Sequence, residues 1–207
     1  AGNLMVRREE QPWQSRATLF LDNRKIAHRG AGAGSSLEHA VSVAASVGVH
    51  LIHRGFSVRL VTAAGGEASS QWHEHGSLMA ETGPLLESLA VVTETGHPHI
   101  NLKWLQDGGH SGLLIGVLGA VGDHDRPTLT RMRHSAANAM AVALDVAAWN
   151  RGPAVQTGAV SWLAGHGWRA VSAGPKDPIP SVWEELGLSG RTAGAHRERI
   201  PTREPAS

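Results

Sequence analysis

Two carboxylates follow expected strands, at the end of a parallel sheet where a hard cation could bind. Asp22 and Asp123 each come soon after a short apolar run. Side chains at the carboxyl ends of neighbouring parallel strands meet at one edge of a sheet, and carboxylate oxygens suit Mg²⁺ or Ca²⁺. Arg24 and Lys25 bring positive charge to the same place. The alternative is that Asp22 pairs with Arg24 or caps a backbone turn, and this is the interpretation we favour.

Two histidine pairs with one residue between them form a second candidate site. On an extended chain such a pair points to one side, and imidazole suits zinc, copper or nickel. A metal site needs three or four ligands in one geometry, and nothing in the sequence brings the two pairs together. We therefore favour surface-loop histidines and expect no metal. The alternative is a metal-binding protein or a metal-dependent enzyme that uses His73, His75, His97 and His99.

A glycine-rich stretch at 30–34 resembles a phosphate cradle before a helix. No lysine follows Gly34, and residues 23–29 separate the glycines from the preceding strand, so neither the P-loop nor the dinucleotide pattern is met. A loop before an ordinary N-cap is the favoured interpretation, with a small-molecule or nucleotide binder as the alternative. The chain also lacks G-x-S-x-G and cysteine. We predict a protein that is not an enzyme and holds no cofactor.

The composition of the chain argues against several other classes of protein and of binding site. The 207 residues carry 19 Lys and Arg against 18 Asp and Glu, without the basic excess of a nucleic-acid-binding protein. The absence of cysteine excludes disulfide frameworks, zinc–thiolate sites and iron–sulfur clusters. Hydrophobic residues make up 41% of the chain and charged residues 18%, as in a packed globular domain.

The elements that would position these residues alternate between strands and helices. We expect strands at 17–21, 57–62, 113–120, 140–146 and 168–172, with a short edge strand near 71–75. Ser35 and Glu38 form a capping box that opens a helix ending near Gly55. Further helices are expected at 84–92, with Pro84 in its first turn, and at 127–135, 154–164 and 180–186, while 93–111 is expected to be a loop. The alternation predicts an α/β fold, a three-layer α/β/α Rossmann-like sandwich with a mostly parallel central sheet.

The chain reads as one domain at 16–187, preceded by an arm at 1–15 and followed by a disordered tail at 188–207. The longest apolar run, 113–122, is about half of the roughly 20 residues that a membrane-spanning helix needs. The chain begins with alanine rather than methionine. We therefore expect it to be the C-terminal portion of a longer protein.

Several stretches together resemble a known family. They are 2–10, 19–22, 35–42 and 54–62. They are similar to the domain-of-unknown-function family 58 proteins, of the actinobacterial type, over about residues 2–173. The resemblance implies a von Willebrand factor A-like domain. It also implies a place beside MoxR-type AAA+ ATPases as partner or adaptor, in the cytoplasm or at the cytoplasmic face of a membrane, with membrane helices upstream in longer members.

The wider relatives of that family bind a divalent cation through D-x-S-x-S, a Thr and a further Asp. Asp22 matches the first position, but Arg24 and Ile26 replace the two serines, while Thr82 and Asp123 are possible matches for the others. The resemblance thus implies a degenerate metal site, and we predict that it binds no Mg²⁺.

These expectations combine into one functional hypothesis. The chain is predicted to be a non-enzymatic protein-interaction module that binds no nucleic acid. Its partner-binding face is predicted to comprise Asp22, Asn23, Arg24, Lys25, Thr82, Asp123 and Asp125. In this hypothesis Arg24 and Lys25 act as a fixed positive charge that receives an acidic group of the partner.

Overall fold

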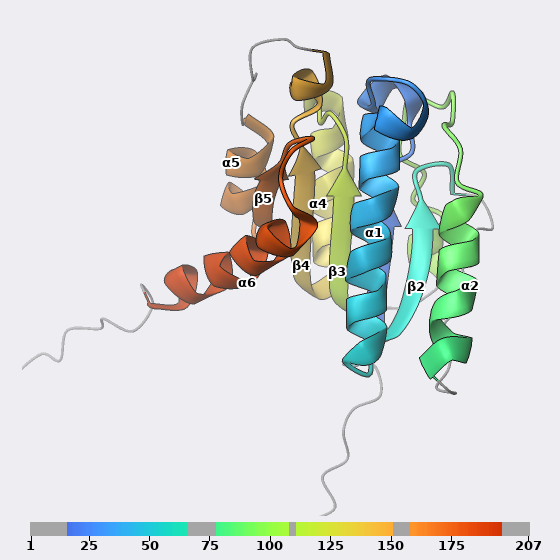
Figure 1. The fold of residues 1–207 in the computed structure, drawn as a ribbon. Coiled ribbons are helices and arrows are strands. Elements are labelled where there is room, and N and C mark those ends of the chain that lie inside the picture. Colours follow the sequence, from blue (N-terminus) through green and yellow to red (C-terminus); the bar gives the residue numbers. More distant parts are fainter. Residues whose placement is uncertain (1–15, 66–77, 108–110, 151–157, 196–207) are drawn as a thin grey trace, which may run out of the picture.

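A five-stranded parallel sheet forms the centre of the molecule (Figure 1). The structure, a computed structural model, describes residues 16–65, 78–107, 111–150 and 158–195. The strands lie in the order β2-β1-β3-β4-β5, and all four pairings are parallel. Their bounds are β1 Arg16–Leu21, β2 Ser57–Thr62, β3 Ser111–Leu118, β4 Ala136–Leu144 and β5 Arg169–Ala173. The predicted Rossmann-like α/β fold is confirmed.

Helices cover both faces of this sheet. They are α1 Ser36–His53, α2 Leu78–Ala90, α3 Trp104–Asp107, α4 Arg126–His134, α5 Gly158–Gly165 and α6 Ile179–Ala195. One core cluster joins the sheet to α1, α2 and α6, and a second joins the opposite face to α3, α4 and α5. Within the described ranges, no helix has the length and apolar character that crossing a membrane requires.

The strands supply both cores because successive side chains point to opposite faces. In β1, Leu19 and Leu21 belong to the first cluster, whereas Phe20 between them belongs to the second. In β3, Ile115 and Leu114 divide in the same way. Burial on both faces explains why these strands read as continuous apolar runs.

Helix α1 begins where the capping signal predicts. Ser35 is its N-cap, and the Ser35 hydroxyl oxygen accepts a hydrogen bond from the Glu38 backbone N–H at 3.2 Å. Further along, Gly48 lets α2 approach closely, because a Cβ there would collide with the buried Leu85 side chain. Helix α1 is thus fixed both at its N-cap and at its contact with α2.

Several element boundaries differ from the sequence predictions. Pro84 lies inside α2, which starts six residues earlier, because burial of Leu85 and Leu89 against the first core carries the helix. Strand β4 starts at Ala136 rather than 140, and α3 interrupts the expected loop. Helix α6 continues to Ala195, past the expected end at 186 and into the predicted tail. The arm at 1–15, the edge strand near 71–75 and the tail at 196–207 lie outside the described residues.

Between the strands and helices, short turns shape the carboxyl edge of the sheet. They are the 3-10 turns η2 Lys25–Ala27, η3 Gly32–Gly34, η4 Asp123–Asp125 and η5 Val146–Asn150. The segment after α2 crosses this edge, since Thr95 pairs with Arg24 and the Asn101 N–H donates to the Ala63 carbonyl. The candidate site is built from these turns.

Candidate site at the carboxyl edge of the sheet

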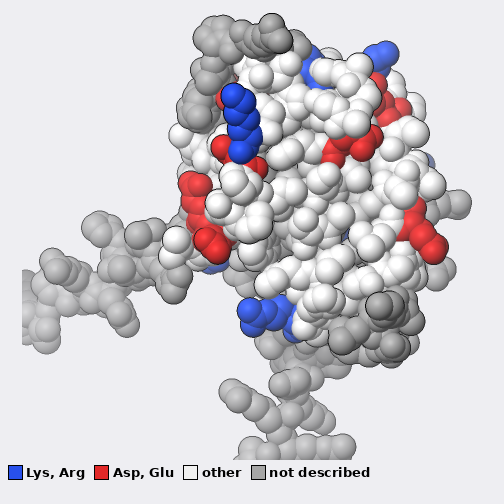
Figure 2. Space-filling view, in the orientation of Figure 1, with Lys and Arg blue, Asp and Glu red and all other residues white. Residues whose placement is uncertain are grey.

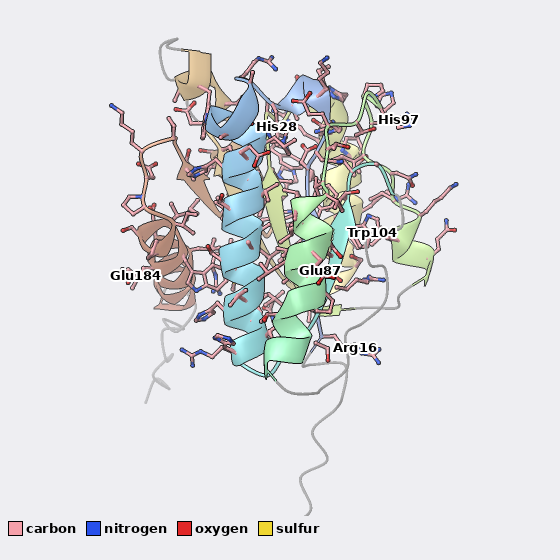
Figure 3. All side chains as sticks on the ribbon, turned by 45° about the vertical axis from the view of Figure 1, so that its right-hand side comes forward. Arg16, His28, Glu87, His97, Trp104 and Glu184 are labelled. Carbon is pink, nitrogen blue, oxygen red and sulfur yellow. The ribbon has the colours of Figure 1, made fainter. Side chains whose placement is uncertain are left out.

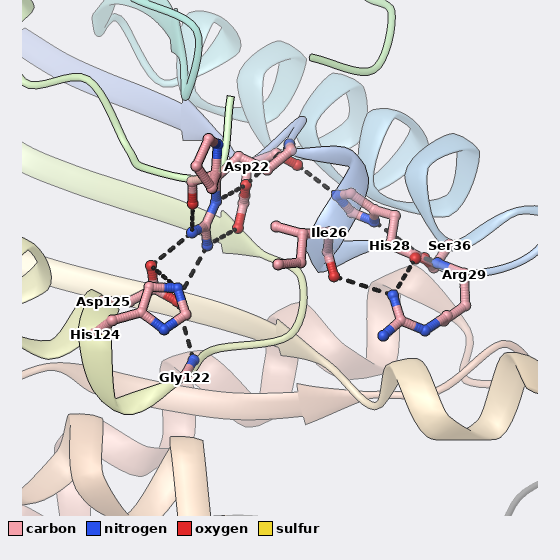
Figure 4. A network of polar contacts seen from close by, with 10 residues as sticks. Asp22, Ile26, His28, Arg29, Ser36, Gly122, His124 and Asp125 are labelled. Atoms are coloured by element: carbon pink, nitrogen blue, oxygen red, sulfur yellow. Dashed lines mark hydrogen bonds and ion pairs between the residues drawn. The ribbon is translucent and has the colours of Figure 1, made fainter. Parts of the chain in front are cut away.

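A buried arginine lies between two buried carboxylates just beyond the end of β1 (Figure 4). The Arg24 Nε and Nη2 atoms donate to Oδ1 and Oδ2 of Asp22, each at 2.9 Å. On its other side, Arg24 Nη1 donates to Asp125 Oδ1 at 2.6 Å and Nη2 to Oδ2 at 3.3 Å. The planar guanidinium therefore fills the space between Asp22 and Asp125 and pairs with both.

Backbone groups complete this network. Arg24 Nη1 also donates to the Pro98 carbonyl at 3.0 Å, and the Arg24 N–H donates to Asp22 Oδ1 at 3.1 Å. The Gly122 N–H donates to Asp125 Oδ2 at 2.9 Å. One side chain thereby ties together the turn after β1, the segment that follows α2 and the turn after β3.

The electrostatics keep this arginine charged. Burial by itself lowers the pKa of Arg24, but the hydrogen bonds and negative charges of Asp22 and Asp125 outweigh it and raise the pKa above its ordinary value. The Arg24 side chain is 1% exposed, and those of Asp22 and Asp125 are 0% and 3% exposed. The cluster is an internal ion triad that solvent does not reach.

Of the carboxylates that the sequence singled out, Asp22 and Asp125 lie in the triad and Asp123 does not. The pairing of Asp22 with Arg24 is confirmed, as is the cap that Asp22 forms on the Arg24 N–H. The expectation that Asp123 lies beside Asp22 is wrong, because Asp123 is solvent-exposed and pairs with Arg126 at 2.9 Å. Asp125, two residues further on, turns inward and provides the second carboxylate.

The predicted partner-binding face contains both buried and exposed residues. Arg24 does not offer its charge to an external acidic group, because two internal carboxylates already occupy the guanidinium. Asn23 is also buried, and its Nδ2 donates to the Thr93 carbonyl at 2.8 Å. Lys25 is exposed at the edge.

Thr82 does not join the site. It lies in α2, eight residues before Ala90, the residue from which the chain continues to the carboxyl edge. Eight residues correspond to about 12 Å of helix at a rise of 1.5 Å per residue. The match between Thr82 and a metal-binding threonine is therefore not supported by its place in the fold.

A histidine that the sequence did not single out supports the same turn. His28 is buried, and its Nε2 donates to the Asp22 carbonyl oxygen. Because a carbonyl only accepts, Nε2 carries the hydrogen, and the Ser36 hydroxyl donates to Nδ1 at 3.0 Å. Ser36 Oγ in turn accepts from the Arg29 N–H at 2.9 Å. No spacing rule marks His28, since its partners are a backbone carbonyl and a helix-start hydroxyl.

The crevice between β1 and β3, where this strand order reverses, is the usual ligand position in such sheets. Here the chain closes it. The Ala120 N–H donates to the Ala27 carbonyl at 2.8 Å, and a Cβ on Gly119 would collide with that carbonyl. The two turns are thus in backbone contact across the crevice, and the neighbouring glycine-rich turn η3 is exposed.

The histidine pairs are only partly within the described residues, because His73 and His75 lie outside them. His97 and His99 are exposed, and the His99 ring packs edge-on against the His124 ring with centroids 6.2 Å apart. Among described residues, no group of three or more His, Asp or Glu side chains could hold a metal ion. Figure 3 shows His97 at the same end of the molecule as His28, opposite Arg16.

Comparison with known proteins adds no identification: no family model matches the chain, and neither does any curated protein. The geometry of the carboxyl edge is therefore the basis for assigning a function.

Proposed function

We propose that this chain is a non-enzymatic protein-interaction module of the von Willebrand factor A-like type, with the carboxyl edge of its sheet as the binding surface. The observation that carries the proposal is the Arg24 guanidinium between Asp22 and Asp125. The Arg24 side chain holds the two carboxylates together, and the resemblance at Asp22 implies that the resembled proteins carry a divalent cation near this position. The ion triad thereby holds the turns of the carboxyl edge in one arrangement.

The way the edge uses its polar groups supports binding rather than catalysis. The Asp22 and Asp125 oxygens accept from Arg24 and from backbone N–H groups, and the two ring nitrogens of His28 are both bonded. Groups that are internally satisfied and shielded from solvent are not positioned to transfer protons to a substrate. What the edge offers instead is a surface of exposed side chains on a rigid support.

The partner class follows from the family resemblance. A MoxR-type AAA+ ATPase encoded beside this chain is the partner we propose, with both proteins in the cytoplasm or at the cytoplasmic face of a membrane. Figure 2 shows that the face bearing α1, α2 and α6 carries scattered charges of both signs. A mixed, largely uncharged surface agrees with protein binding better than with nucleic-acid binding.

The test is a binding titration between the purified chain and that ATPase. The variant Lys25→Glu with Ile26→Asp changes two exposed edge residues and leaves Arg24 intact. The matched control, Arg54→Glu with Leu188→Asp, makes the same changes at exposed positions away from the edge. Leu188 is 53% exposed and Ile26 54% exposed. We expect the edge variant to lose binding and the control to keep it, and equal binding by both variants would remove the edge from the proposal.

A further inference from the structure

We propose that the outer side of β5 binds an extended segment of a partner protein, which adds to the sheet as a sixth strand. The surface concerned, called the β5 edge below, is the side of Arg169–Ala173 that faces away from β4. This inference goes beyond the proposed function, because the β5 edge is a different surface from the carboxyl edge. Strand addition to an open sheet edge is a general mode of peptide recognition, in which main-chain hydrogen bonds supply the affinity.

Two residues of β5 direct their main-chain groups away from the rest of the sheet. The Ala173 carbonyl accepts from the Asp145 N–H at 2.9 Å, so the main-chain groups of Ala173 face β4. The direction of these groups alternates along a strand, and those of Ala170 and Ser172 therefore point to the β5 edge. Within the described part of the chain, no backbone hydrogen bond reaches Ala170 or Ser172 from that side. Their N–H and carbonyl groups are placed to pair with an added strand.

The β5 edge has few of the features that protect open sheet edges. Natural proteins protect such edges with proline, with charged side chains, with bulges or by keeping the strand short. Strand β5 is five residues long and contains no proline, and its charge is confined to Arg169 at its start. Ala170 and Ser172 are small and only half-buried, so a second strand can approach them closely.

Helix α6 extends beyond the sheet that it covers. Figure 1 shows the second half of α6 running past the β5 edge. Leu188, in this half, is 53% exposed. The described contacts of α6 with the first core come from its first half, at Ile179, Val182, Trp183 and Leu186. Because adjacent strands lie about 4.8 Å apart, a strand added to β5 would lie under the extending part of α6 and give it an apolar neighbour.

The end of the β5 edge at which β5 begins is positively charged. Arg169 is the first strand residue, and Arg133 reaches the same end, where its Nε donates to the Gly167 carbonyl at 2.7 Å. Among the described residues, neither guanidinium is paired with a carboxylate. The sequence has no acid in α4, in α5 or between α5 and β5. The two positive charges at this end do not depend on the protonation of any histidine.

The end at which β5 finishes has one net negative charge. Asp177 accepts from the Gly174 N–H at 2.7 Å just beyond the strand. Asp145 is bonded to the last strand residue, and Lys176 offsets one of the two acids. The two ends of the β5 edge therefore differ in sign, and a segment bound along it is expected to have a preferred direction.

The exposed acids of α6 do not alter this difference. Figure 3 places Glu184 at mid-height, between the level of Arg16 and that of His28, and Glu185 follows it in α6. Antiparallel strand pairs outnumber parallel ones roughly two- to three-fold, and an antiparallel segment brings its last residues to Arg169. The partner segment is therefore extended, ends on a carboxylate, and carries an apolar side chain where it passes α6.

A displayed library of random peptides, selected against the full chain, tests the inference without assuming the partner. We expect the enriched peptides to alternate apolar and polar residues and to carry Asp or Glu near their carboxyl end. They are then titrated against the wild type, Ser172→Pro, Ser172→Thr and Arg169→Glu. Proline removes an outward N–H that the described fold does not use, whereas threonine keeps it. We expect Ser172→Pro and Arg169→Glu to bind at least about tenfold more weakly, and Ser172→Thr to bind like the wild type.

Changes in the peptide test the same contacts without any change in the protein, and so cover the case in which Ser172→Pro does not fold. Each enriched peptide is N-methylated at one position at a time. Methylation of the amides that face β5 should abolish binding, and methylation of the alternate amides should spare it, which gives a period of two. Saturating peptide should also slow hydrogen exchange at the Ala170 and Ser172 N–H groups.

Several outcomes would overturn the inference. They are recovery of no peptide, loss of binding without a period of two, and equal binding by Ser172→Pro and Ser172→Thr when both are folded. A dimer of the full chain that Ser172→Pro dissociates would assign the β5 edge to a second copy, and would overturn it as well.

The Lys25→Glu, Ile26→Asp variant separates this inference from the proposed function. It should bind the enriched peptides like the wild type, because it changes only the carboxyl edge. Weaker peptide binding by this variant would contradict the assignment to β5, whatever its effect on ATPase binding. Unchanged peptide binding supports the β5 edge even if the ATPase does not bind.

Discussion

At the scale of single residues, the ion triad is the feature with the largest expected effect on stability. Replacing Arg24 by Met keeps most of the volume but leaves Asp22 and Asp125 buried without a cation. Removing one partner of a buried charge pair costs about 3–5 kcal/mol. We expect Arg24→Met to lower the free energy of unfolding in urea by about that amount, whereas Lys25→Met at the exposed neighbouring position stays within about 0.5 kcal/mol of the wild type.

A compensating variant separates charge from packing. The triple variant combines Asp22→Asn, Arg24→Met and Asp125→Asn. Its amide oxygens can still accept from the backbone N–H groups of residues 24 and 122, but none of the three side chains is charged. We expect it to regain most of the stability that Arg24→Met loses. If the triple variant is as unstable as the single one, the contacts of the Arg24 side chain with its surroundings, and not charge neutralisation, hold the edge together.

Divalent cations provide a second test of the same triad. The wild type is expected not to bind Mg²⁺ or Mn²⁺ here, because the guanidinium occupies the carboxylate oxygens. In Arg24→Ser, the vacated space is lined by two carboxylates and one hydroxyl, which suit a hard cation. Millimolar Mn²⁺ should therefore raise the melting temperature of Arg24→Ser and not that of the wild type. A calorimetric signal for Mg²⁺ in the wild type at micromolar affinity would contradict the assignment.

His39 gives the fold a pH dependence of known sign. Burial lowers the pKa of His39, and the Asp177 carboxylate offsets part of the effect. Its Nε2 is buried and has no hydrogen-bond partner among the residues that the structure describes, and its ring packs edge-on against Trp149. Below about pH 6.5, the ordinary histidine value, the unfolded chain takes up the proton first. The stability that neutral His39 contributes is therefore present above that pH and declines below it.

The variant His39→Leu removes this titration. Its free energy of unfolding should fall less between pH 8 and pH 5 than that of the wild type, as measured by urea unfolding at both values. His97→Leu, at an exposed position, serves as the control and should follow the wild-type pH profile. The same decline in both variants would assign the pH dependence to other groups.

At the scale of the elements, the closure between β1 and β3 depends on one glycine. A methyl group at Gly119 would collide with the Ala27 carbonyl, which is backbone and cannot rotate away. Gly119→Ala should therefore force η2 away from the turn after β3 and cost about 1–3 kcal/mol. Gly34→Ala, whose added methyl group meets nothing within 4 Å, is the control and should be nearly neutral. Equal stabilities would mean that the two turns separate without strain.

The elements also show what the sequence could and could not predict. The bounds of β2 were predicted without error, because Gly55 and the run of strand-forming residues at 57–62 are local signals. Ser35 was recognised as an N-cap for the same reason. The early start of α2 was missed because Pro84 suggested a helix beginning, while packing of Leu85 and Leu89 on the sheet overrides that preference. Boundaries set by tertiary packing are not readable from local patterns.

In the candidate site, too, contacts between sequence neighbours were predictable and contacts between distant residues were not. Asp22 and Arg24 are two residues apart, so their pairing could be proposed from spacing. Asp125 is 101 residues from Arg24 in the sequence, and only the strand order brings them together. Spacing alone could therefore not tell whether Asp123 or Asp125 turns toward Asp22. His28 was missed because its partners, the Asp22 carbonyl and the Ser36 hydroxyl, form no spacing pattern that marks a histidine.

At the scale of the whole molecule, the strand order predicts a gradient of local stability. Strands β1, β3 and β4 each have two strand neighbours, whereas β2 and β5 have one strand neighbour each within the described part of the sheet. Backbone N–H groups bonded on inner strands exchange with solvent mainly by global unfolding. We expect the slowest hydrogen exchange at Leu19, Ile115 and Val142, which are buried in the sheet, and faster exchange along β5. Uniform protection across all five strands would contradict this gradient.

The ion triad makes the carboxyl edge independent of bound cations. A bound ion can be chelated, exchanged or diluted away, so a surface organised by it has an empty state that the surroundings can select. Arg24 is covalently part of the chain and pairs with Asp22 and Asp125 at every ion concentration. The carboxyl edge is consequently constitutive: chelators and swings in magnesium leave its shape unchanged. For the interaction module that we propose, a change in the concentration of divalent cations is therefore not a switch of the binding surface.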